Sequence, residues 1–549
     1  MRPPETRVRL RPLRPLRPLT AVALLGGAAL IALLAVTVIA PHPTVAGVLG
    51  LVVVVVCLTA LYQATRSGFF APVAVTFWAF VVVWVGFAPL LQIRDRVLPW
   101  PDTPLYQFYV TAQVILLFAV LSFWAGYQRS SRSESRRDTP GRVGRGPRAA
   151  RRGRLARWTN GLPSVTVTVE KALVVTAFAA GLTVVCLPRT GGLAVRFADR
   201  DTLDAAIVAA GLRGGRDLAM LGLLSTLPAA AGVVALVLCL LCWRNRSARG
   251  RRGTILLTVA TVVAGTVNLI YNNPLSATRF ASFSVLLAAG FALLRFDRRR
   301  WRVAFSWAIL LGLLVLYPLA NLFRNEQSRQ DLRVGLGAYY TYDFDGFQQT
   351  VNDVYYVSVH GHTWGHHIAS ALLFWVPRSL WEGKAIGAGN VLAASRGYQF
   401  QNLSLPFWAE VYLEFSLLGV IVLFYFYGRL ARRLDLALRE RPAGLGTLVT
   451  VVFAACQIGL LRGSLGGQIP FAGAAFAVAL TGVTLWRGAG WGLTRSPGER
   501  PAAESGTAAE PATGPAAGAA GPDPGSDGPA AGAAGPVTGR PAHVGELRP

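Results

Sequence analysis

Apolar runs of about 20 residues recur along this chain of 549 residues, and an α-helix needs about that length to cross the hydrocarbon core of a bilayer. Backbone that crosses lipid must satisfy its hydrogen bonds internally, and a helix does so within one segment. The mean hydropathy of +0.44 and a hydrophobic content of 53% agree with many such segments. The sequence therefore predicts an all-α polytopic membrane protein.

Hydropathy and arginine placement together predict the topology. We place twelve spans at 20–40, 44–63, 70–90, 105–127, 168–187, 218–243, 254–272, 278–295, 303–322, 404–428, 444–461 and 469–487. With the N-terminus inside, the Arg-rich stretches fall in inner loops, and the one from Arg129 to Arg157 alone holds eleven Arg. Because Lys and Arg favour the cytoplasmic side, both termini are expected in the cytoplasm of a multi-pass plasma-membrane protein. The net charge of +27 is then explained by topology, and no nucleic-acid partner is expected.

This topology divides the chain into seven parts. We expect a basic cytoplasmic N-terminus (1–19), helices 1–4 (20–127), a basic cytoplasmic loop (128–167), helices 5–9 (168–322) with an outer loop at 188–217, a large extracytoplasmic loop (323–403), helices 10–12 (404–487) and a cytoplasmic tail (496–549). The tail is rich in Pro, Ala and Gly, cannot bury a core and is expected to be disordered. The two long outer loops exceed ordinary connection lengths, so we expect them to be folded and functional.

Two residue patterns narrow the chemistry. The five cysteines lie in or beside apolar runs, which is typical of small buried apolar residues rather than disulfide partners. The sequence has no GxxxxGK[ST] motif, and no GxGxxG follows a strand, so a nucleotide-binding domain is not expected on the inner side. No cofactor is predicted.

Several arginines fall at the predicted outer face, where the positive-inside rule disfavours them. They are Arg196, Arg200, Arg279, Arg324 and Arg462. They could pair with nearby acids or lie among lipid headgroups. As a set they also suit an anionic headgroup such as a polyprenyl pyrophosphate, because a guanidinium stays charged and binds phosphate bidentately.

Two acids lie within the tenth predicted span. Glu410 and Glu414 are one turn apart, near its outer end, and a carboxylate in a membrane helix must face protein or water. Glu410 could act as a general base toward an incoming hydroxyl, or it could belong to a structural ion pair. The sequence leaves both interpretations open.

The stretch HGHTWGHH, residues 360–367, holds four of the six histidines. His362 and His366 are four residues apart, as in a helical zinc pair, but the Glu of HExxH is replaced and no third ligand follows. Gly361 and Gly365 argue against a regular helix. Neighbouring aromatic residues and the short apolar run that ends near Pro377 instead favour an interfacial segment, and no metal is expected.

Residues from about 270 to 470 resemble the O-antigen polymerase or oligosaccharide repeat-unit polymerase family, which is related to the O-antigen ligases. The resemblance rests on WVPRSLWEGKAIGAGN (375–390), SLPFWAEVYLEFSLLGVIVLFYFYG (404–428) and LLRGSLGG (460–467), together with the large third and fifth outer loops. It implies a metal-independent glycosyltransferase of the GT-C type, whose donor is a polyprenyl-diphosphate-linked oligosaccharide. It also implies membrane lipids, a flippase and chain-length regulators as partners.

The resemblance assigns roles to residues as well. Arg279, Arg324, Arg378 and Arg462 would hold the pyrophosphate, and Glu410 would lie beside the transferring sugar. Glu410, His362 or His366 would take the proton of the acceptor hydroxyl. A ligase that transfers a finished glycan, a transporter or flippase for lipid-linked sugars, and a GT-C enzyme that uses a polyprenyl-monophosphate sugar remain alternatives.

Overall fold

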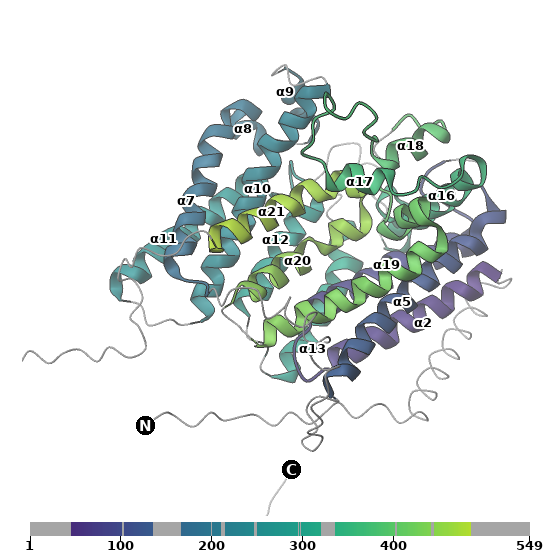
Figure 1. The fold of residues 1–549 in the computed structure, drawn as a ribbon, viewed down its shortest axis with the longest axis horizontal. Helices are drawn as coiled ribbons and strands as arrows, with labels where there is room; N and C mark the ends of the chain where they lie inside the picture. Colours follow the sequence, from purple (N-terminus) through teal and green to yellow (C-terminus); the bar gives the residue numbers. More distant parts are fainter. Residues whose placement is uncertain are drawn as a thin grey trace, which may run out of the picture. The chain divides into compact units, whose positions relative to one another are not determined.

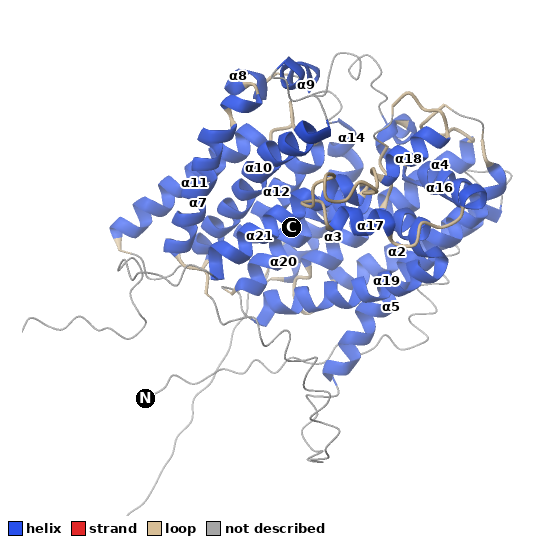
Figure 2. Cartoon of the chain, turned by 45° about the horizontal axis from the view of Figure 1, so that its top comes forward, coloured by secondary structure: helices blue, strands red, loops and turns tan. Residues whose placement is uncertain are grey.

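A computed structural model describes residues 45–101, 104–135, 166–198, 200–209, 215–245, 250–294, 296, 298–319, 335–400, 403–440 and 444–484. Within these ranges the regular structure is helical apart from one β-bridge between Thr166 and Gly444 (Figure 2). Ten of the helices or helical segments there are long and apolar enough to cross a membrane. The predicted class, an all-α polytopic membrane protein, is confirmed. The first predicted span (20–40) and the tail (496–549) lie outside the described residues.

The helices follow the predicted apolar runs closely. They are α2 (Val45–Thr65), α3 (Pro72–Val81), α4 (Ala88–Asp95), α5 (Tyr109–Ser135), α7 (Val169–Cys186), α8 (Gly192–Arg196), α9 (Arg200–Ala209), α10 (Gly215–Arg244), α11 (Arg251–Tyr271), α12 (Arg279–Leu293), α13 (Arg299–Leu311), α14 (Tyr317–Leu319), α16 (Gly346–His360), α17 (His366–Leu372), α18 (Ala388–Ser395), α19 (Phe407–Glu440), α20 (Leu445–Arg462) and α21 (Leu465–Thr484). Short π-helical stretches, Val82–Phe87 and Gly312–Leu316, join α3 to α4 and α13 to α14.

Three helices differ in length from the sequence expectation. At about 1.5 Å per residue, α12 with its 15 residues is about 22 Å long, which is shorter than a bilayer core. α5 and α19 instead continue as helix into residues that we expected to be inner loops. A span predicted from hydropathy ends at the first charged residues. The helix itself can continue beyond them, because charged residues can also have good helical propensity.

The long helix α19 crosses α5 at unusually close range, and the two run side by side in Figure 1. A Cβ atom added to Gly428 would lie 2.1 Å from the carbonyl oxygen of Phe123, and one added to Gly126 would lie 2.0 Å from that of Tyr425. Small residues at such a crossing let two backbones approach and pack tightly, which is how membrane helices associate. Two glycines, one on each helix, therefore fix this contact.

Charged and aromatic contacts join the segments that we expect at the inner face. Asp435 of α19 accepts hydrogen bonds from the backbone N–H groups of Val73 (2.9 Å) and Ala74 (3.2 Å) in the first turn of α3. Phe70, just before α3, stacks on Phe296 at 3.8 Å between ring centroids. Segments predicted for this face thus lie together in the structure.

The opposite end of α19 is broken. Phe415 and Ser416 have non-helical backbone angles, and the φ of Ser416 is +61°. The N–H groups of Thr363 and Trp364 donate to the carbonyl oxygens of Leu413 and Glu414, at 3.1 Å each. The histidine-rich turn between α16 and α17 therefore satisfies backbone acceptors that the break leaves open.

The α5–α19 crossing gives a first testable prediction. Gly428→Ala should lower the free energy of unfolding by about 1–3 kcal/mol, because overpacking forces the two backbones apart. Thermal unfolding of the protein in detergent measures this loss. The matched control is Gly181→Ala on α7, where an added Cβ meets nothing within 4 Å. Equal melting temperatures for the two variants would contradict the tight crossing.

Candidate functional site

One cavity of about 620 Å³ lies among the segments that the topology assigns to the outer face. Its lining residues come from the connection after α4 (Trp100), from 274–280 at the start of α12, from 342–345 and 387–404 in the large loop, and from 462–468 between α20 and α21. Four connections far apart in sequence thus meet around one space, with a volume typical of ligand sites.

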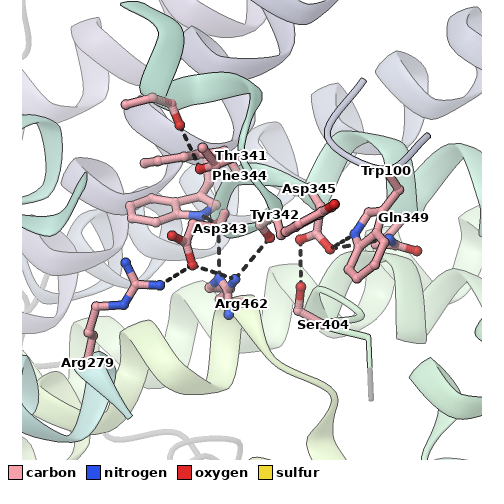
Figure 3. Close-up of polar contacts among 12 residues, drawn as sticks. Trp100, Arg279, Thr341, Tyr342, Asp343, Phe344, Asp345, Gln349, Ser404 and Arg462 are labelled. Atoms are coloured by element: carbon pink, nitrogen blue, oxygen red, sulfur yellow. Dashed lines mark hydrogen bonds and ion pairs between the residues drawn. The ribbon is translucent and has the colours of Figure 1, made fainter. Parts of the chain in front are cut away.

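Two arginines share one carboxylate in this cavity. Arg279, the first residue of α12, and Arg462, the last residue of α20, both point at Asp343 (Figure 3). Arg279 Nη2 donates to Asp343 Oδ1, and Arg462 Nη2 lies 3.6 Å from the same oxygen. Arg462 Nε also donates to the backbone carbonyl of Asp343 at 3.1 Å. Two positive charges therefore surround the one negative charge of Asp343.

Polar side chains of the segment from α3 to α4 bind the backbone around Asp343. Trp84 Nε1 donates to the carbonyl oxygen of Asp343 at 2.9 Å. Gln92 Nε2 donates to the carbonyl oxygens of Tyr339 and Phe344, at 2.9 Å each. These bonds satisfy carbonyl groups of two short 3-10 helical turns, Gly335–Tyr340 and Tyr342–Phe344, that lie against membrane helices. The loop carrying Asp343 is thus held by the helices rather than free at the surface.

Aromatic rings hold the two guanidiniums from the other side. The guanidinium carbon of Arg279 lies 5.0 Å from the ring centroid of Tyr317, and that of Arg462 lies 4.9 Å from Phe280. Both distances are within the range of cation–π contacts. Nη1 of Arg279 is buried without a hydrogen-bond partner. An anion in the cavity could satisfy that donor, and guanidinium groups bind phosphate oxygens in this way.

A second carboxylate, Asp345, lines the same cavity, on the other side of Tyr342 (Figure 3). Its Oδ2 accepts from Trp100 Nε1 at 2.9 Å and from Gln349 Nε2 at 3.2 Å, and its Oδ1 accepts from Ser404 Oγ at 2.6 Å. Burial raises the pKa of Asp345, although these donors and the nearby positive charge of Arg462 oppose the shift. The two acids of the cavity therefore differ in environment: Asp343 is ion-paired, whereas the hydrogen bonds to Asp345 come from neutral donors.

The predicted acids of α19 are buried and bonded to backbone, and neither lines the cavity. Glu410 Oε2 accepts from the N–H of Leu465, the first residue of α21, at 2.7 Å. Glu414 Oε1 accepts from the N–H of His367 at 3.1 Å and lies 2.9 Å from its Nδ1. Both carboxylates thus cap helix N-termini. Leu465 follows Arg462 by three residues, so Glu410 also holds the turn that presents this arginine.

A third acid lies beside this pair. Asp353 of α16 is fully buried, and both of its carboxylate oxygens lack a hydrogen-bond partner. Burial, followed by the nearby charges of Glu410 and Glu414, raises the pKa of Asp353 well above its ordinary value.

The histidines form a turn outside the cavity lining. The helix ends at His360 and a new one begins at His366, and the φ values of Gly361 and Gly365 are +79° and +91°. The expected interruption at these glycines is confirmed. His362 Nδ1 lies 3.3 Å from the carbonyl oxygen of Leu413, and the exposed His366 has its Nε2 2.8 Å from that of Gly383. In the described ranges no group of three or more His, Cys, Asp or Glu side chains could hold a metal ion.

The remaining predicted arginines do not join the cavity. Arg378 is exposed and donates to the carbonyl oxygens of Lys384 and Ala385, at 2.5 and 3.1 Å. Arg196 is buried over the ring of Tyr271 at 4.7 Å and does not line the cavity. Arg324 and the side chain of Arg200 lie outside the part of the chain that the structure describes. Of the predicted cations, the structure brings together Arg279 and Arg462.

The sequence analysis missed both acids of the cavity. Asp343 and Asp345 belong to the stretch YYTYDFDGF (339–347), where two acids alternate with aromatic residues in a segment expected to be extracytoplasmic. That alternation was a signal for a site, because charged residues among buried aromatic residues need partners. The partners themselves were not visible, since Arg279 precedes Asp343 by 64 residues and Arg462 follows it by 119.

The shared carboxylate gives a second prediction. Asp343→Asn should lower the free energy of unfolding by about 3–5 kcal/mol, because it leaves two largely buried guanidiniums without a counter-charge. Thermal unfolding in detergent measures the change. The control, Asp95→Asn, removes an exposed partner of Arg94 and should cost about 0–1 kcal/mol. A loss for Asp343→Asn no larger than that of the control would contradict the ion-pair cluster.

Comparison with known proteins identified no relative of this chain. No protein-family model matches the chain, no curated protein is significantly similar to it, and no solved structure matches its fold. A function must therefore be argued from the residues of the cavity.

Proposed function

We propose that this protein is a membrane glycosyltransferase that polymerises polyprenyl-diphosphate-linked oligosaccharide units into a surface polysaccharide at the extracytoplasmic face. The observation that carries the proposal is the cluster of Arg279 and Arg462 around Asp343, in a cavity formed by segments expected at that face. The sequence resemblance described above supplies the substrate class.

The pair of guanidiniums suits a diphosphate. Two guanidiniums with one carboxylate between them can bind a dianionic group while Asp343 keeps them oriented. When the bond from the anomeric carbon to the diphosphate breaks, negative charge grows on the leaving oxygen. Fixed guanidiniums stabilise that charge more in the transition state than in the ground state, and this difference accelerates the reaction. The chain supplies this stabilisation with its own side chains.

The other half of the cavity suits a sugar. Tyr342 and Phe400 line it and pack against Trp100, with 49% and 50% of their surfaces exposed, so part of each side chain remains available to a ligand. Asn390, Ser464 and Gln468 line it as well and offer polar groups. Ser464 Oγ is buried without a hydrogen-bond partner, which a sugar hydroxyl could provide. A mixture of apolar walls and a few polar groups is typical of small-molecule sites.

Within this proposal, Glu410 positions Arg462 through the N–H of Leu465. Its predicted role as the base beside the sugar stays a prediction, as do the roles of His362, His366 and Arg378. A ligase that transfers a finished glycan would use the same cavity.

The break in α19 at Phe415 and Ser416 favours a second candidate, a transporter or flippase of lipid-linked sugars, because discontinuous membrane helices often form transport sites. Two carbonyl groups at the break are already bonded to Thr363 and Trp364, and this favours the enzyme.

The test is complementation of a strain in which the gene is deleted. Arg279→Ala and Arg462→Ala should each reduce long surface glycan, because loss of one guanidinium typically costs about 10²–10³-fold in rate. Single repeat units should accumulate on lipid. Arg94→Ala, which removes a cation outside the cavity, is the matched control and should restore polymer.

Other outcomes would assign a different function to the protein. Long polymer that remains on lipid would identify a ligase. Lipid-linked units that are retained on the inner side of the membrane would identify a flippase. Full rescue by well-expressed Arg279→Ala and Arg462→Ala would contradict the proposed site.

A further inference from the structure

Asp345 lines the same cavity as Arg279 and Arg462. Figure 3 shows it beside Ser404 and Trp100, on the other side of Tyr342 from Asp343 and the guanidiniums. Phe400 lines the cavity as well. The side chain of Asp345 is fixed by three donors from three separate segments: Trp100, Gln349 and Ser404. A group held this firmly is preorganised for one geometry, which proton transfer requires.

The hydrogen bonds of Asp345 leave room for one more donor. Each oxygen of an ionised carboxylate can accept about two hydrogen bonds. Oδ2 already accepts two, from Trp100 and Gln349, whereas Oδ1 accepts one, from Ser404. Ser404 also lines the cavity. A hydroxyl in the cavity could therefore donate to Oδ1 beside the serine.

The two acids of the cavity suit different tasks. Asp343 lies between two guanidiniums and orients them. Asp345 has neutral hydrogen-bond donors, and burial raises its pKa above the ordinary value. Two carboxyl groups whose environments differ in this way commonly divide the electrostatic and acid–base roles of a reaction.

We propose that Asp345 is the general base that takes the proton of the acceptor sugar hydroxyl, and that Ser404 positions it. This inference rests on the proposed glycosyltransferase function. In the step, the acceptor oxygen forms a bond to the anomeric carbon of the donor while the bond from that carbon to the diphosphate breaks. The bonding electrons leave with the diphosphate, which Arg279 and Arg462 hold, and the hydroxyl proton passes to Asp345 Oδ1. The products are the extended glycan and the lipid diphosphate.

The test uses the full-length purified protein added to membranes of the deletion strain, which hold the endogenous lipid-linked units. Asp345→Asn should reduce the initial rate of polymer formation by about 10²-fold or more, since general-base catalysis contributes about 10²–10⁴-fold. The shift in melting temperature produced by inorganic pyrophosphate should stay as in the wild type, because Arg279 and Arg462 are intact. Asp95→Asn is the matched control and should keep the wild-type rate.

The pH dependence separates a base from a structural residue. Asp345 acts only when ionised, so the wild-type rate should rise as pH increases through its raised pKa. The residual rate of Asp345→Asn should lack that rise. Ser404→Ala keeps the carboxylate but removes a hydrogen bond that lowers the pKa of Asp345, so its rate should rise at higher pH than that of the wild type.

The outcomes distinguish the two claims. If Asp345→Asn keeps more than a tenth of the wild-type rate, or loses the pyrophosphate shift together with its rate, Asp345 is not the base, whereas the assignment of the arginines stands. If Asp345→Asn does not fold, an unchanged pH profile in Ser404→Ala overturns the inference. If the wild type forms no polymer under any condition, the proposed function fails and this inference with it.

Discussion

Buried carboxylates on α19 accept hydrogen bonds from the N-termini of three other helices, and much of the described structure depends on these bonds. Asp435 caps α3, Glu414 caps α17 and Glu410 caps α21. The first N–H groups of a helix have no partner within it, and leaving them unpaired in an apolar environment is costly. A negative charge at that position also interacts favourably with the helix dipole. A single helix thus orients three others.

The candidate site depends on these helix caps indirectly, through the turn that carries Arg462. Glu410 holds the N-terminus of α21 and thereby the short turn that carries Arg462. Trp84 and Gln92 hold the backbone on either side of Asp343. Arg279 is positioned because it begins α12, where Thr278 Oγ1 accepts from the N–H of Ala281. The two arginines of the cavity therefore project from helix ends, and a rigid frame favours electrostatic stabilisation of a transition state.

The histidine-rich stretch has a structural role in the fold. Its backbone N–H groups pair with carbonyl groups at the break of α19, and His367 pairs with Glu414. The turn therefore closes a discontinuous membrane helix. Of the four histidine side chains, those of His362 and His367 contact α19, through the carbonyl oxygen of Leu413 and the carboxylate of Glu414.

The sequence alone determined the class of the protein and the positions of most helices. Both follow from local properties of the sequence, because a segment of about 20 apolar residues is stable as a helix across a bilayer whatever its neighbours are. The sequence also singled out Arg279 and Arg462, since the predicted topology places both at the outer face, where Lys and Arg are disfavoured. Only the tertiary structure decided that these two meet Asp343, that Asp345 shares their cavity, and that Glu410 caps a helix. Each of those contacts joins residues more than 50 positions apart, and long-range pairing is set by how the helices pack rather than by any local pattern.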